Sequence, residues 1–411
     1  MEVTASPELA ALATLAIVLG AGVVAASVAK RLGLPDIVLY LLAGVLLGPV
    51  LGWLDVAPGS TLNQFILTAG AAYILFDGGT TLRFRVLQEI WLLLVVLATI
   101  GVAITGAVVA LAAHWLLGLP VLVAALLGAT LASTDPATLV PVFRHVKVKE
   151  RVAQLVMSES AMNDATGAIL TFTVLALLEA ASRGGGVSLS GALVELLIAA
   201  GVGLVTGAAC GYAAAALVAG GRSPLPRELR GLITLLVVAG AYSLAVSFGG
   251  SGFMAVFTAG VMLMNYESFG HVLDGGERHQ LELEIGNLSL LFRVLIFVLL
   301  GSQVDFALIE RYLLPGMGIV AIFMLVARPA TVFLCALVDR RAGWTRDELL
   351  FMSWTRETGV IPAALVGLLA GRGAPNIDAI GAVTFIAILA TILIQASTTR
   401  WWAARLGLLE P

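Results

Sequence analysis

Two carboxylates, an amide and two hydroxyls lie in one otherwise apolar stretch, residues 158–164, which reads Ser-Glu-Ser-Ala-Met-Asn-Asp. On a helix, Glu159 and Asn163 are four residues apart, as are Ser160 and Asp164, so these side chains project from adjoining faces. Oxygen ligands suit hard cations better than soft ones. The stretch therefore predicts a site for a hard monovalent or divalent cation. The alternative is a polar seam with a structural role only.

A second polar group, Ser-Thr-Asp-Pro at residues 133–136, interrupts another apolar run. Proline lacks a backbone N–H and disfavours helix at the residue before it, so we expect a broken helix here. Inside a membrane, the backbone groups that a break frees are tolerated where they line a cavity or bind a ligand. Thr134 and Asp135 are therefore candidate site residues. The alternative is a proline kink that Asp135 caps at the entry to a loop.

A third group, Thr-Arg-Glu-Thr-Gly at residues 355–359, is followed by Pro362. It places the adjacent opposite charges of Arg356 and Glu357 in a further apolar run. The glycine and the proline beside these charges predict a second interrupted helix.

Arg328 and Asp77 are two further ionisable candidates inside apolar runs. A lone buried arginine needs a carboxylate partner, because an uncompensated buried charge is strongly destabilising. Glu159 and Glu357 are the candidate partners, and we expect Arg328 to be a fixed counter-charge rather than an ion ligand. Asp77 ends an apolar run, where capping at the membrane interface and a role at the site are both open interpretations.

The chemistry open to such a site is competition between a cation and a proton. Burial favours the protonated form of a carboxylic acid, so a buried carboxylate exchanges protons nearer neutral pH than an exposed one. If the same oxygens bind either a proton or a metal cation, alternating access of that site gives antiport. With Glu159 held by Arg328, Asp164 and Asp135 remain able to titrate. If Asp164 alone does so, one cation exchanges for one proton and no net charge moves.

The composition places this chemistry in a membrane. Of the 411 residues, 60% are hydrophobic and 12% are charged, about half the roughly 25% charged residues of soluble proteins. The mean hydropathy is +1.02, and the apolar stretches are continuous, which excludes a soluble enzyme and a transmembrane β-barrel. The formal net charge of −3 gives no argument for nucleic-acid binding. Cys210, Cys335 and the four histidines lack metal-ligand spacing, so we expect no cofactor.

Thirteen apolar segments can cross a bilayer, for which a helix needs about 20 residues. We expect an all-α polytopic membrane protein with thirteen transmembrane helices and no soluble domain at either end. The segments are residues 8–29, 35–52, 62–79, 89–115, 120–143, 152–181, 189–220, 229–248, 251–267, 281–302, 312–338, 346–371 and 378–402.

The positive-inside rule tests this division independently. With the N-terminus outside, 17 of the 23 Lys and Arg residues fall in inner loops or the C-terminal tail, three in outer loops and three within segments. We therefore predict an outer N-terminus and a cytoplasmic C-terminus. The two interrupted helices are segments five and twelve, which then run in opposite directions. Such a pair is typical of transporters built from inverted repeats, here segments four to six and eleven to thirteen.

The motifs around the site resemble the monovalent cation/proton antiporter superfamily, specifically its sodium/proton exchanger (NhaP-like) branch with an Asn-Asp pair. The resemblance runs along essentially the whole chain. It is carried by Thr134-Asp135-Pro136, Glu159-Ser160, Asn163-Asp164, Leu34-Pro35 through Gly48-Pro49, Phe76-Asp77-Gly78-Gly79, Ser251-Gly252-Phe253 and Phe297–Gly301.

The resemblance implies an NhaA/NapA-like antiporter fold with two crossed discontinuous helices, forming a homodimer among the lipids of a prokaryotic inner membrane. It implies scaffold and dimerisation helices at residues 1–88 and 223–311, joined by a linker helix at 183–222. An ion-transport core at residues 89–182 and 312–411 would carry the ion by an elevator-like movement.

For the site, the resemblance implies that Asp164 binds the cation and, alternately, the proton. It implies that Ser160 and the Thr134 backbone are further ligands of Na⁺, with Asp135 close by. Asn163 would support the site. Relatives with an Asn-Asp pair are generally electroneutral.

The resemblance also implies an ion pair between Glu159 and Arg328, and the chain departs from the family at two places. The glutamate of the family's third-segment motif is Asp77 here. The usual Gly-Leu-Arg-Gly of the twelfth segment is replaced by Trp-Thr-Arg-Glu-Thr at residues 354–358, which adds Glu357 beside Arg356.

Three alternatives to Na⁺/H⁺ exchange remain from the sequence. We favour Na⁺ and Li⁺ because a compact carboxylate and hydroxyl site suits a small ion, but K⁺/H⁺ antiport by the same mechanism is open. A cation channel is more remote, because no filter-like run of carbonyl-presenting residues is evident. Gly-Gly-Ser-Gly at residues 249–252 superficially matches a membrane serine protease. No histidine at membrane depth could activate Ser251, and a tight turn explains the motif.

Overall fold

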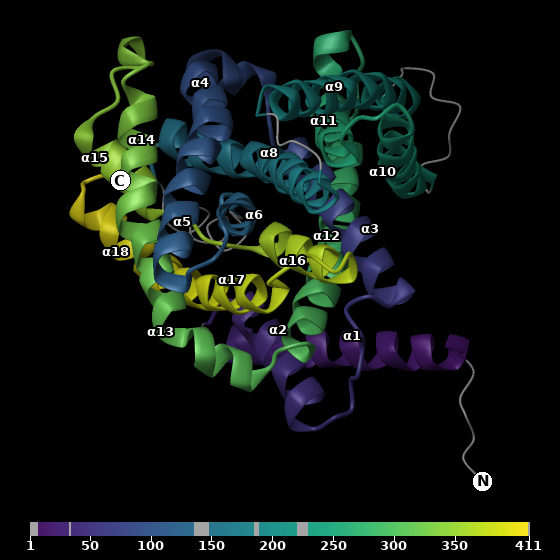
Figure 1. Ribbon diagram of the computed structural model, residues 1–411. Coiled ribbons are helices and arrows are strands. Elements are labelled where there is room, and N and C mark those ends of the chain that lie inside the picture. Colours follow the sequence, from purple (N-terminus) through teal and green to yellow (C-terminus); the bar gives the residue numbers. More distant parts are fainter. Residues whose placement is uncertain (1–6, 33, 135–147, 185–188, 220–228, 410–411) are drawn as a thin grey trace.

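The structure is a computed structural model that describes residues 7–32, 34–134, 148–184, 189–219 and 229–409 (Figure 1). Within these residues the regular elements are helices, apart from one isolated bridge between Val148 and Leu409. Eight of the described helices, straight or bent, are long and apolar enough to cross a membrane, and four shorter apolar helices accompany them. The predicted all-α class is confirmed, whereas the count of thirteen crossings stays a prediction.

The first seven predicted segments each coincide with helical structure. The fifth is helical to Leu131, and its residues 135–143 lie outside the described residues. The elements are α1 (Pro7–Leu32), α2 (Asp36–Val45) with the π-helical segment η1 (Leu46–Val50), α3 (Thr61–Thr80), α4 (Phe84–Val96) continuing through η2 (Leu97–Gly101) into α5 (Val102–Leu117), α6 (Val121–Leu131), α8 (Glu150–Ser182) and α9 (Leu189–Ala219).

The other six segments also coincide with helical structure. The eleventh and thirteenth are bent, and the twelfth is broken. The elements are α10 (Arg230–Ser247), α11 (Gly252–Met264) with the 3₁₀ turn η4 (Tyr266–Phe269), α12 (Gly275–Ser302), α13 (Phe306–Ile322) continuing through η5 (Phe323–Ala327) into α14 (Arg328–Ala336), the 3₁₀ turn η6 (Arg340–Ala342), α15 (Arg346–Trp354), α16 (Val360–Gly371), and α17 (Ile377–Thr391) continuing through η7 (Ile392–Ala396) into α18 (Ser397–Arg405).

Two of these helices begin six residues earlier than hydropathy predicts, because aspartates cap them. The Asp274 carboxylate accepts a hydrogen bond from the Gly275 N–H at 2.8 Å, and α12 starts there rather than at residue 281. The Asp305 carboxylate likewise accepts from the Ala307 N–H at 2.8 Å, and α13 starts at Phe306 rather than at residue 312. Capping aspartates extend these helices into polar sequence that a search for apolar runs leaves out.

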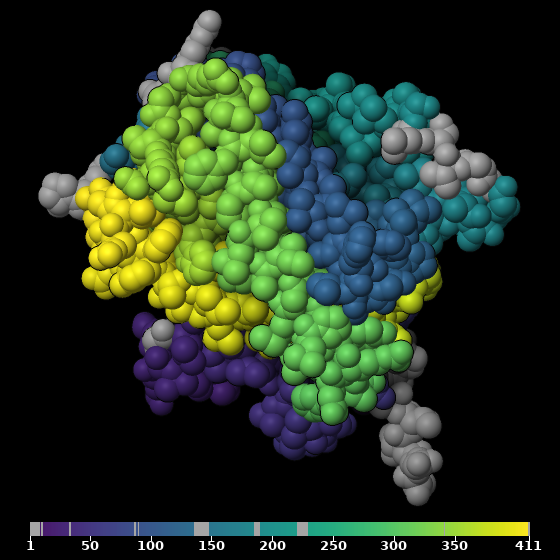
Figure 2. Space-filling model, turned by 60° about the vertical axis from the view of Figure 1, so that its left-hand side comes forward, coloured from purple at the N-terminus to yellow at the C-terminus, as the bar shows by residue number. Residues whose placement is uncertain are grey.

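The helices of the two predicted inverted repeats show the same features at matching positions. Segments four and eleven each contain a π-helical segment, η2 and η5, and Thr105 and Thr331 follow these by one turn. The two threonines are 226 residues apart and their hydroxyls are hydrogen-bonded at 2.9 Å. Equivalent residues contact each other only near the axis that relates their repeats. Figure 2 shows α13 and α14 (green) running beside α4 and α5 (blue), as this inverted-repeat fold requires.

Small residues bring α3 and α11 into backbone contact. A Cβ atom on Gly79 would lie 2.1 Å from the Phe257 carbonyl oxygen, and one on Gly260 would lie 2.1 Å from that of Phe76. In lipid, where burying apolar surface between helices gives little driving force, such close packing holds helices together. The pair also packs against α8, and so forms a wall beside the helix that carries the candidate site.

Segments that join successive helices contact one another where the predicted topology places them at the same end of the molecule. The Arg83 guanidinium, between α3 and α4, donates to the Met264 carbonyl at the end of α11, at 2.6 Å. At the opposite end, the Gln303 amide after α12 donates to Asn63 at the start of α3, at 3.1 Å. These contacts agree with the predicted alternation of helix direction. Which end faces the cytoplasm stays a prediction.

Candidate cation site

Helix α8 carries the polar side chains of residues 158–164 inside the protein. Glu159, Ser160, Asn163 and Asp164 are each at most 5% exposed. Because residues four apart lie one turn from each other, the helix presents these groups together to the helices beside it. The burial of two carboxylates at this depth needs partners, and two other core elements supply them.

The end of α6 meets α8 through Thr134, which is buried and lies outside the helix. Asn163 accepts a hydrogen bond from the Thr134 N–H at 3.0 Å, and its amide donates to the Thr134 hydroxyl at 2.9 Å. The Ser160 hydroxyl donates to the Thr134 carbonyl. Side chains of α8 therefore satisfy the backbone groups that the end of α6 frees. The structure brings together Thr134, Ser160 and Asn163, as expected of a site built on these residues.

Asp164 contacts the same cluster through Ser133, the residue before Thr134. The Ser133 hydroxyl donates a hydrogen bond to the Asp164 carboxylate, and both residues are buried. Ser133 is not among the predicted ligands, although it begins the polar group of residues 133–136. Asp135, which the family resemblance implies lies close to the cation, and Pro136, which predicts the helix break, lie outside the described residues.

Glu159 is held between two arginines. The Arg328 guanidinium binds it in bidentate fashion, with Nη1 at 2.8 Å from Oε1 and Nη2 at 2.6 Å from Oε2. Arg356 Nη1 lies 3.0 Å from the same Oε1. All three residues are at most 3% exposed. Of the two partners predicted for Arg328, Glu159 and Glu357, the structure shows Glu159. The binding of Arg356 to the same carboxylate is not predicted from the sequence.

The second break joins this ion-pair cluster to α6. Residues Thr355–Gly359 separate α15 from α16 and are buried, and the Thr358 N–H donates to the Thr391 hydroxyl of α17 at 3.0 Å. The Arg356 guanidinium also donates to the carbonyl of Ala132, at the end of α6. The interruption predicted for segment twelve is confirmed. Arg356 thereby connects the break between α15 and α16 to the end of α6.

Two predicted residues lie near these clusters, and the described contacts give them no ligand role. Asp77, on α3, is half-buried. A Cβ atom on the next residue, Gly78, would lie 3.3 Å from the Ala161 Cβ, so Asp77 is close to the point where α3 meets α8. Glu357 is 1% exposed and lies within the break of segment twelve. Both remain candidates by position.

The Gly-Gly-Ser-Gly motif of residues 249–252 is a helix start. The Ser251 hydroxyl oxygen accepts a hydrogen bond from the Met254 N–H at 3.2 Å and so caps α11. Gly249 has φ +74°, which glycine adopts without strain. The tight-turn interpretation of this motif is confirmed.

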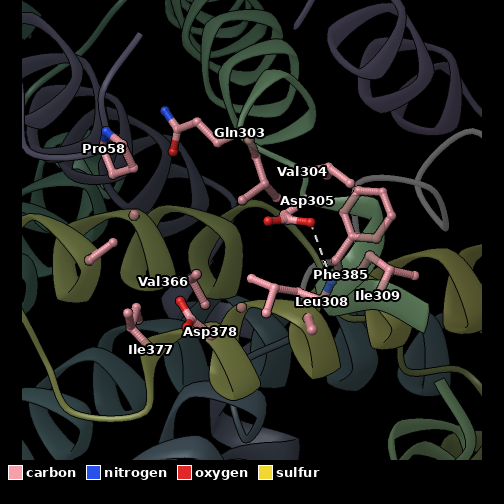
Figure 3. A pocket seen from close by; sticks show the side chains of 15 residues that line it. Pro58, Gln303, Val304, Asp305, Leu308, Ile309, Val366, Ile377, Asp378 and Phe385 are labelled. Atoms are coloured by element: carbon pink, nitrogen blue, oxygen red, sulfur yellow. Dashed lines mark hydrogen bonds between the residues drawn. The ribbon is translucent and has the colours of Figure 1, made fainter. Parts of the chain in front are cut away.

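A cavity of about 170 Å³ lies where Gln303 and Asp305, between α12 and α13, face Val366 of α16 and Asp378 of α17 (Figure 3). Asp305 caps α13, accepting a further hydrogen bond from the Leu308 N–H at 3.3 Å. Asp378 lies in the first turn of α17, where a carboxylate complements the helix dipole. Both carboxylates therefore have structural explanations, and we assign no cation site to this cavity.

The arrangement is suited to binding a desolvated cation and to protonation of a carboxylate at the same place. Carboxylate, hydroxyl and carbonyl oxygens of Asp164, Ser160 and Thr134 lie together in the interior. Among the described residues, no group of three or more His, Cys, Asp or Glu side chains could hold a metal ion.

Comparison with known proteins agrees with this assembly. A family model described as "Sodium/hydrogen exchanger, transmembrane" matches residues 15–405. The chain is 31% identical over 420 residues to Na(+)/H(+) antiporter 1 of Methanocaldococcus jannaschii, covering 96% of this chain and 94% of that protein. It is 29% identical over 407 residues to the K(+)/H(+) antiporter NhaP2 of Shewanella oneidensis, covering 96% of this chain and 66% of that longer protein. The chain therefore belongs to the sodium/hydrogen exchanger family.

Solved structures show the same fold. The sodium proton antiporter MjNhaP1 from Methanocaldococcus jannaschii at pH 8 superposes with a TM-score of 0.83 at 28% identity, over 96% of this chain and 98% of that one. An electron-microscopy structure of MjNhaP1 matches with a TM-score of 0.79 at 27% identity, over the whole of both chains. The chain is thus a multi-pass membrane protein of a transporter family with an antiporter fold.

Proposed function

We propose that this chain exchanges Na⁺ for H⁺ across a membrane, with both ions competing for Asp164. The observation that carries the proposal is the cluster of buried oxygens in which Asp164 meets the end of α6 beside Ser160 and Thr134. Membership of the sodium/hydrogen exchanger family and the likeness to an archaeal Na⁺/H⁺ antiporter support it.

The hydrogen bonds of the site suggest how one ion replaces the other. In the structure, the Ser133 hydroxyl donates to Asp164 and the Ser160 hydroxyl donates to the Thr134 carbonyl. A hydroxyl can rotate and offer a lone pair instead of its proton. When Na⁺ enters, the two hydroxyls would turn their oxygens toward it, while the Thr134 carbonyl and Asp164 carboxylate become ligands. When a proton binds Asp164, the hydrogen bonds re-form without the cation.

The ion-pair cluster suggests why the exchange would be electroneutral. Both Arg328 and Arg356 bind Glu159, so this carboxylate stays ionised and is not available to carry a proton. Asp164 would then be the carboxylate that titrates in each cycle, and one proton would exchange for one Na⁺. Coupled carboxylates titrate as a group, so the stoichiometry is a property to be measured rather than read from one residue.

Ion preference is tested directly in proteoliposomes. With an internal pH-sensitive dye and an imposed proton gradient, we expect Na⁺ and Li⁺ to dissipate the gradient at lower concentrations than K⁺. A larger response to K⁺ would favour K⁺/H⁺ antiport, the activity named for several relatives of 29–30% identity. Cation flux that continued without proton counterflow would instead indicate a channel.

We further propose that residues 89–182 and 312–411 form a core that moves against a scaffold of residues 1–88 and 223–311, with 183–222 as the linker. One buried apolar cluster supports this division, because every member comes from the proposed core. Its members lie on or next to α5, α6, α8, α13, η5, α16 and α17. A cluster of this kind would let the core move as one body.

The contact between α3 of the scaffold and α16 of the core suggests where this movement takes place. The Gln64 amide of α3 donates to the Gly367 carbonyl of α16 at 2.9 Å. A Cβ atom on Gly367 would lie 2.4 Å from Leu67 Cδ1, and one on Gly371 would lie 2.1 Å from the Gln64 amide nitrogen. The two glycines, one turn apart, form a smooth strip of α16 along which α3 can slide.

We expect Gly367→Ala to slow exchange while leaving the apparent KM for Na⁺ unchanged, because the added methyl obstructs the sliding contact and not the site. Overpacking at such a contact costs about 1–3 kcal/mol. Gly381→Ala is the matched control, because its Cβ would meet Val366 at an ordinary 3.6 Å within the core. Equal exchange rates for the two variants would contradict the proposed role of this contact.

We propose the orientation that the basic residues predict, with the C-terminus in the cytoplasm of a prokaryotic cell and the protein in its inner membrane. We also propose a homodimer, as the family resemblance implies. The large apolar side chains exposed on α1, α9 and α10 offer surface for lipid or for a second copy.

A further inference from the structure

A basic cavity lies at the connector between α3 and α4, far in sequence from the cation site. It has a volume of about 340 Å³. It is lined by Arg83 at the end of the connector, Arg85 in the first turn of α4 and Arg278 near the start of α12, together with Glu267 and Ser268 of η4. By the predicted topology this is the cytoplasmic surface of the membrane, where lipid headgroups lie.

The arginines are not fully neutralised by the carboxylates around them. Glu282 lies 3.0 Å from the Arg83 guanidinium and 3.1 Å from that of Arg278, so one carboxylate serves two cations. Glu267 is 3.5 Å from Arg278. Arg85 is exposed, and within the described part of the chain it has no ion pair closer than 4.0 Å. Among the side chains that the structure describes here, three guanidinium groups thus face two carboxylates.

Arg83 is destabilised by Arg278, whereas the pKa of Arg278 lies above its usual value because desolvation is outweighed by the hydrogen bond and charge of Glu282. The pKa of Arg83 lies below its usual value because the side chain is partly desolvated, and the nearby charge of Arg278 lowers it further, against the opposing effect of Glu282. An anion in the cavity would relieve this repulsion. Arginine is well suited to the task, because its planar fork of donors matches the geometry of phosphate oxygens.

We propose that this cavity, lined by Arg83, Arg85 and Arg278, binds the phosphate group of an anionic phospholipid. Its place at the end of α3 and the start of α4 puts it at headgroup depth, which favours a lipid over free phosphate as the source of that group. The connector joins the proposed scaffold to the proposed core. A bound headgroup would therefore fasten the start of α4 to α12.

The test measures thermal stabilisation of the delipidated protein in detergent by added lipid. We expect phosphatidylglycerol to raise the Tm, and phosphatidylcholine and inorganic phosphate at equal concentration to have little effect. Arg85→Gln should need about fivefold more phosphatidylglycerol for half of the effect, from roughly 1 kcal/mol per surface arginine. The double variant Arg85→Gln/Arg278→Gln should lose the selective response. Arg346→Gln is the control, since it removes an exposed positive charge at the same predicted surface.

Two kinds of result would contradict the proposal, one on the identity of the ligand and one on the site. Stabilisation by inorganic phosphate that depends on Arg85, without preference for phosphatidylglycerol, would show a phosphate site and overturn the lipid as its occupant. Equal effects of phosphatidylglycerol and phosphatidylcholine, or a lipid response unchanged in the double variant, would overturn the site itself. The Tm of each variant without lipid shows that it is folded.

Discussion

Asp164→Asn is expected to reduce cation-dependent proton flux to the level of empty proteoliposomes. The amide keeps the shape of the side chain, and its oxygen can still accept the hydrogen bond from Ser133, so the fold should survive. It can neither take up a proton near neutral pH nor supply the negative charge that a desolvated cation needs. Exchange should therefore vanish while the Tm changes little. Flux is measured with a pH-sensitive dye, and Tm on the same preparation.

Ser133→Ala is the control for this result, because it removes the hydrogen bond to Asp164 and keeps the carboxylate. We expect this variant to retain exchange, with a changed dependence on pH and on Na⁺ concentration. If Asp164→Asn exchanged ions nearly normally, the assignment of the site would be wrong. If both variants were equally inactive, the Ser133 hydroxyl would be essential as well, and loss of exchange in Asp164→Asn would no longer single out the carboxylate.

Glu159→Gln should be the most destabilising single change in the core, because it leaves Arg328 and Arg356 buried beside each other without the carboxylate that pairs with both. Removing one partner of a buried ion pair typically costs about 3–5 kcal/mol. Arg328→Met should cost less, since Arg356 still binds Glu159. Ser160→Ala, which removes a hydrogen bond between neutral groups, should cost about 1 kcal/mol. Thermal unfolding in one detergent orders the three variants.

The double variant Glu159→Gln/Arg328→Met separates loss of the ion pair from a general effect of each substitution. It leaves a single unpaired arginine, so its Tm should lie above the value that the two single changes predict by addition. Additive losses, or a Tm of Glu159→Gln no lower than that of Ser160→Ala, would contradict the ion-pair account.

The sequence was sufficient for the parts of the fold that the membrane constrains most strongly. Apolar segments must be helical in lipid, because their backbone groups find no other partners. Buried charges must be paired, so Glu159 could be named as a candidate partner of Arg328 from the scarcity of other carboxylates at that depth. The interruption at Thr355–Gly359 followed from glycine, proline and charge in one apolar run.

The parts that could not be predicted depend on contacts between distant segments. Arg356 stands next to Glu357 in the sequence, and nothing in that local pattern indicates that its guanidinium reaches Glu159 and the carbonyl of Ala132. The contact between Thr105 and Thr331 depends on two π-helical segments that no periodicity revealed. Ser133 resembles any serine beside a helix break, and only its place opposite Asp164 gives it a role.

The most direct test of the account is the number of protons released when Na⁺ binds to the purified protein in weakly buffered detergent solution. At a pH at which Asp164 is protonated before Na⁺ is added, each Na⁺ bound should release one proton if Na⁺ displaces it from Asp164, and Asp164→Asn should release none. Calorimetry in buffers of different ionisation enthalpy measures this number together with the amount of Na⁺ bound. Saturating Na⁺ binding with no proton release from the unaltered protein would contradict competition for a shared carboxylate.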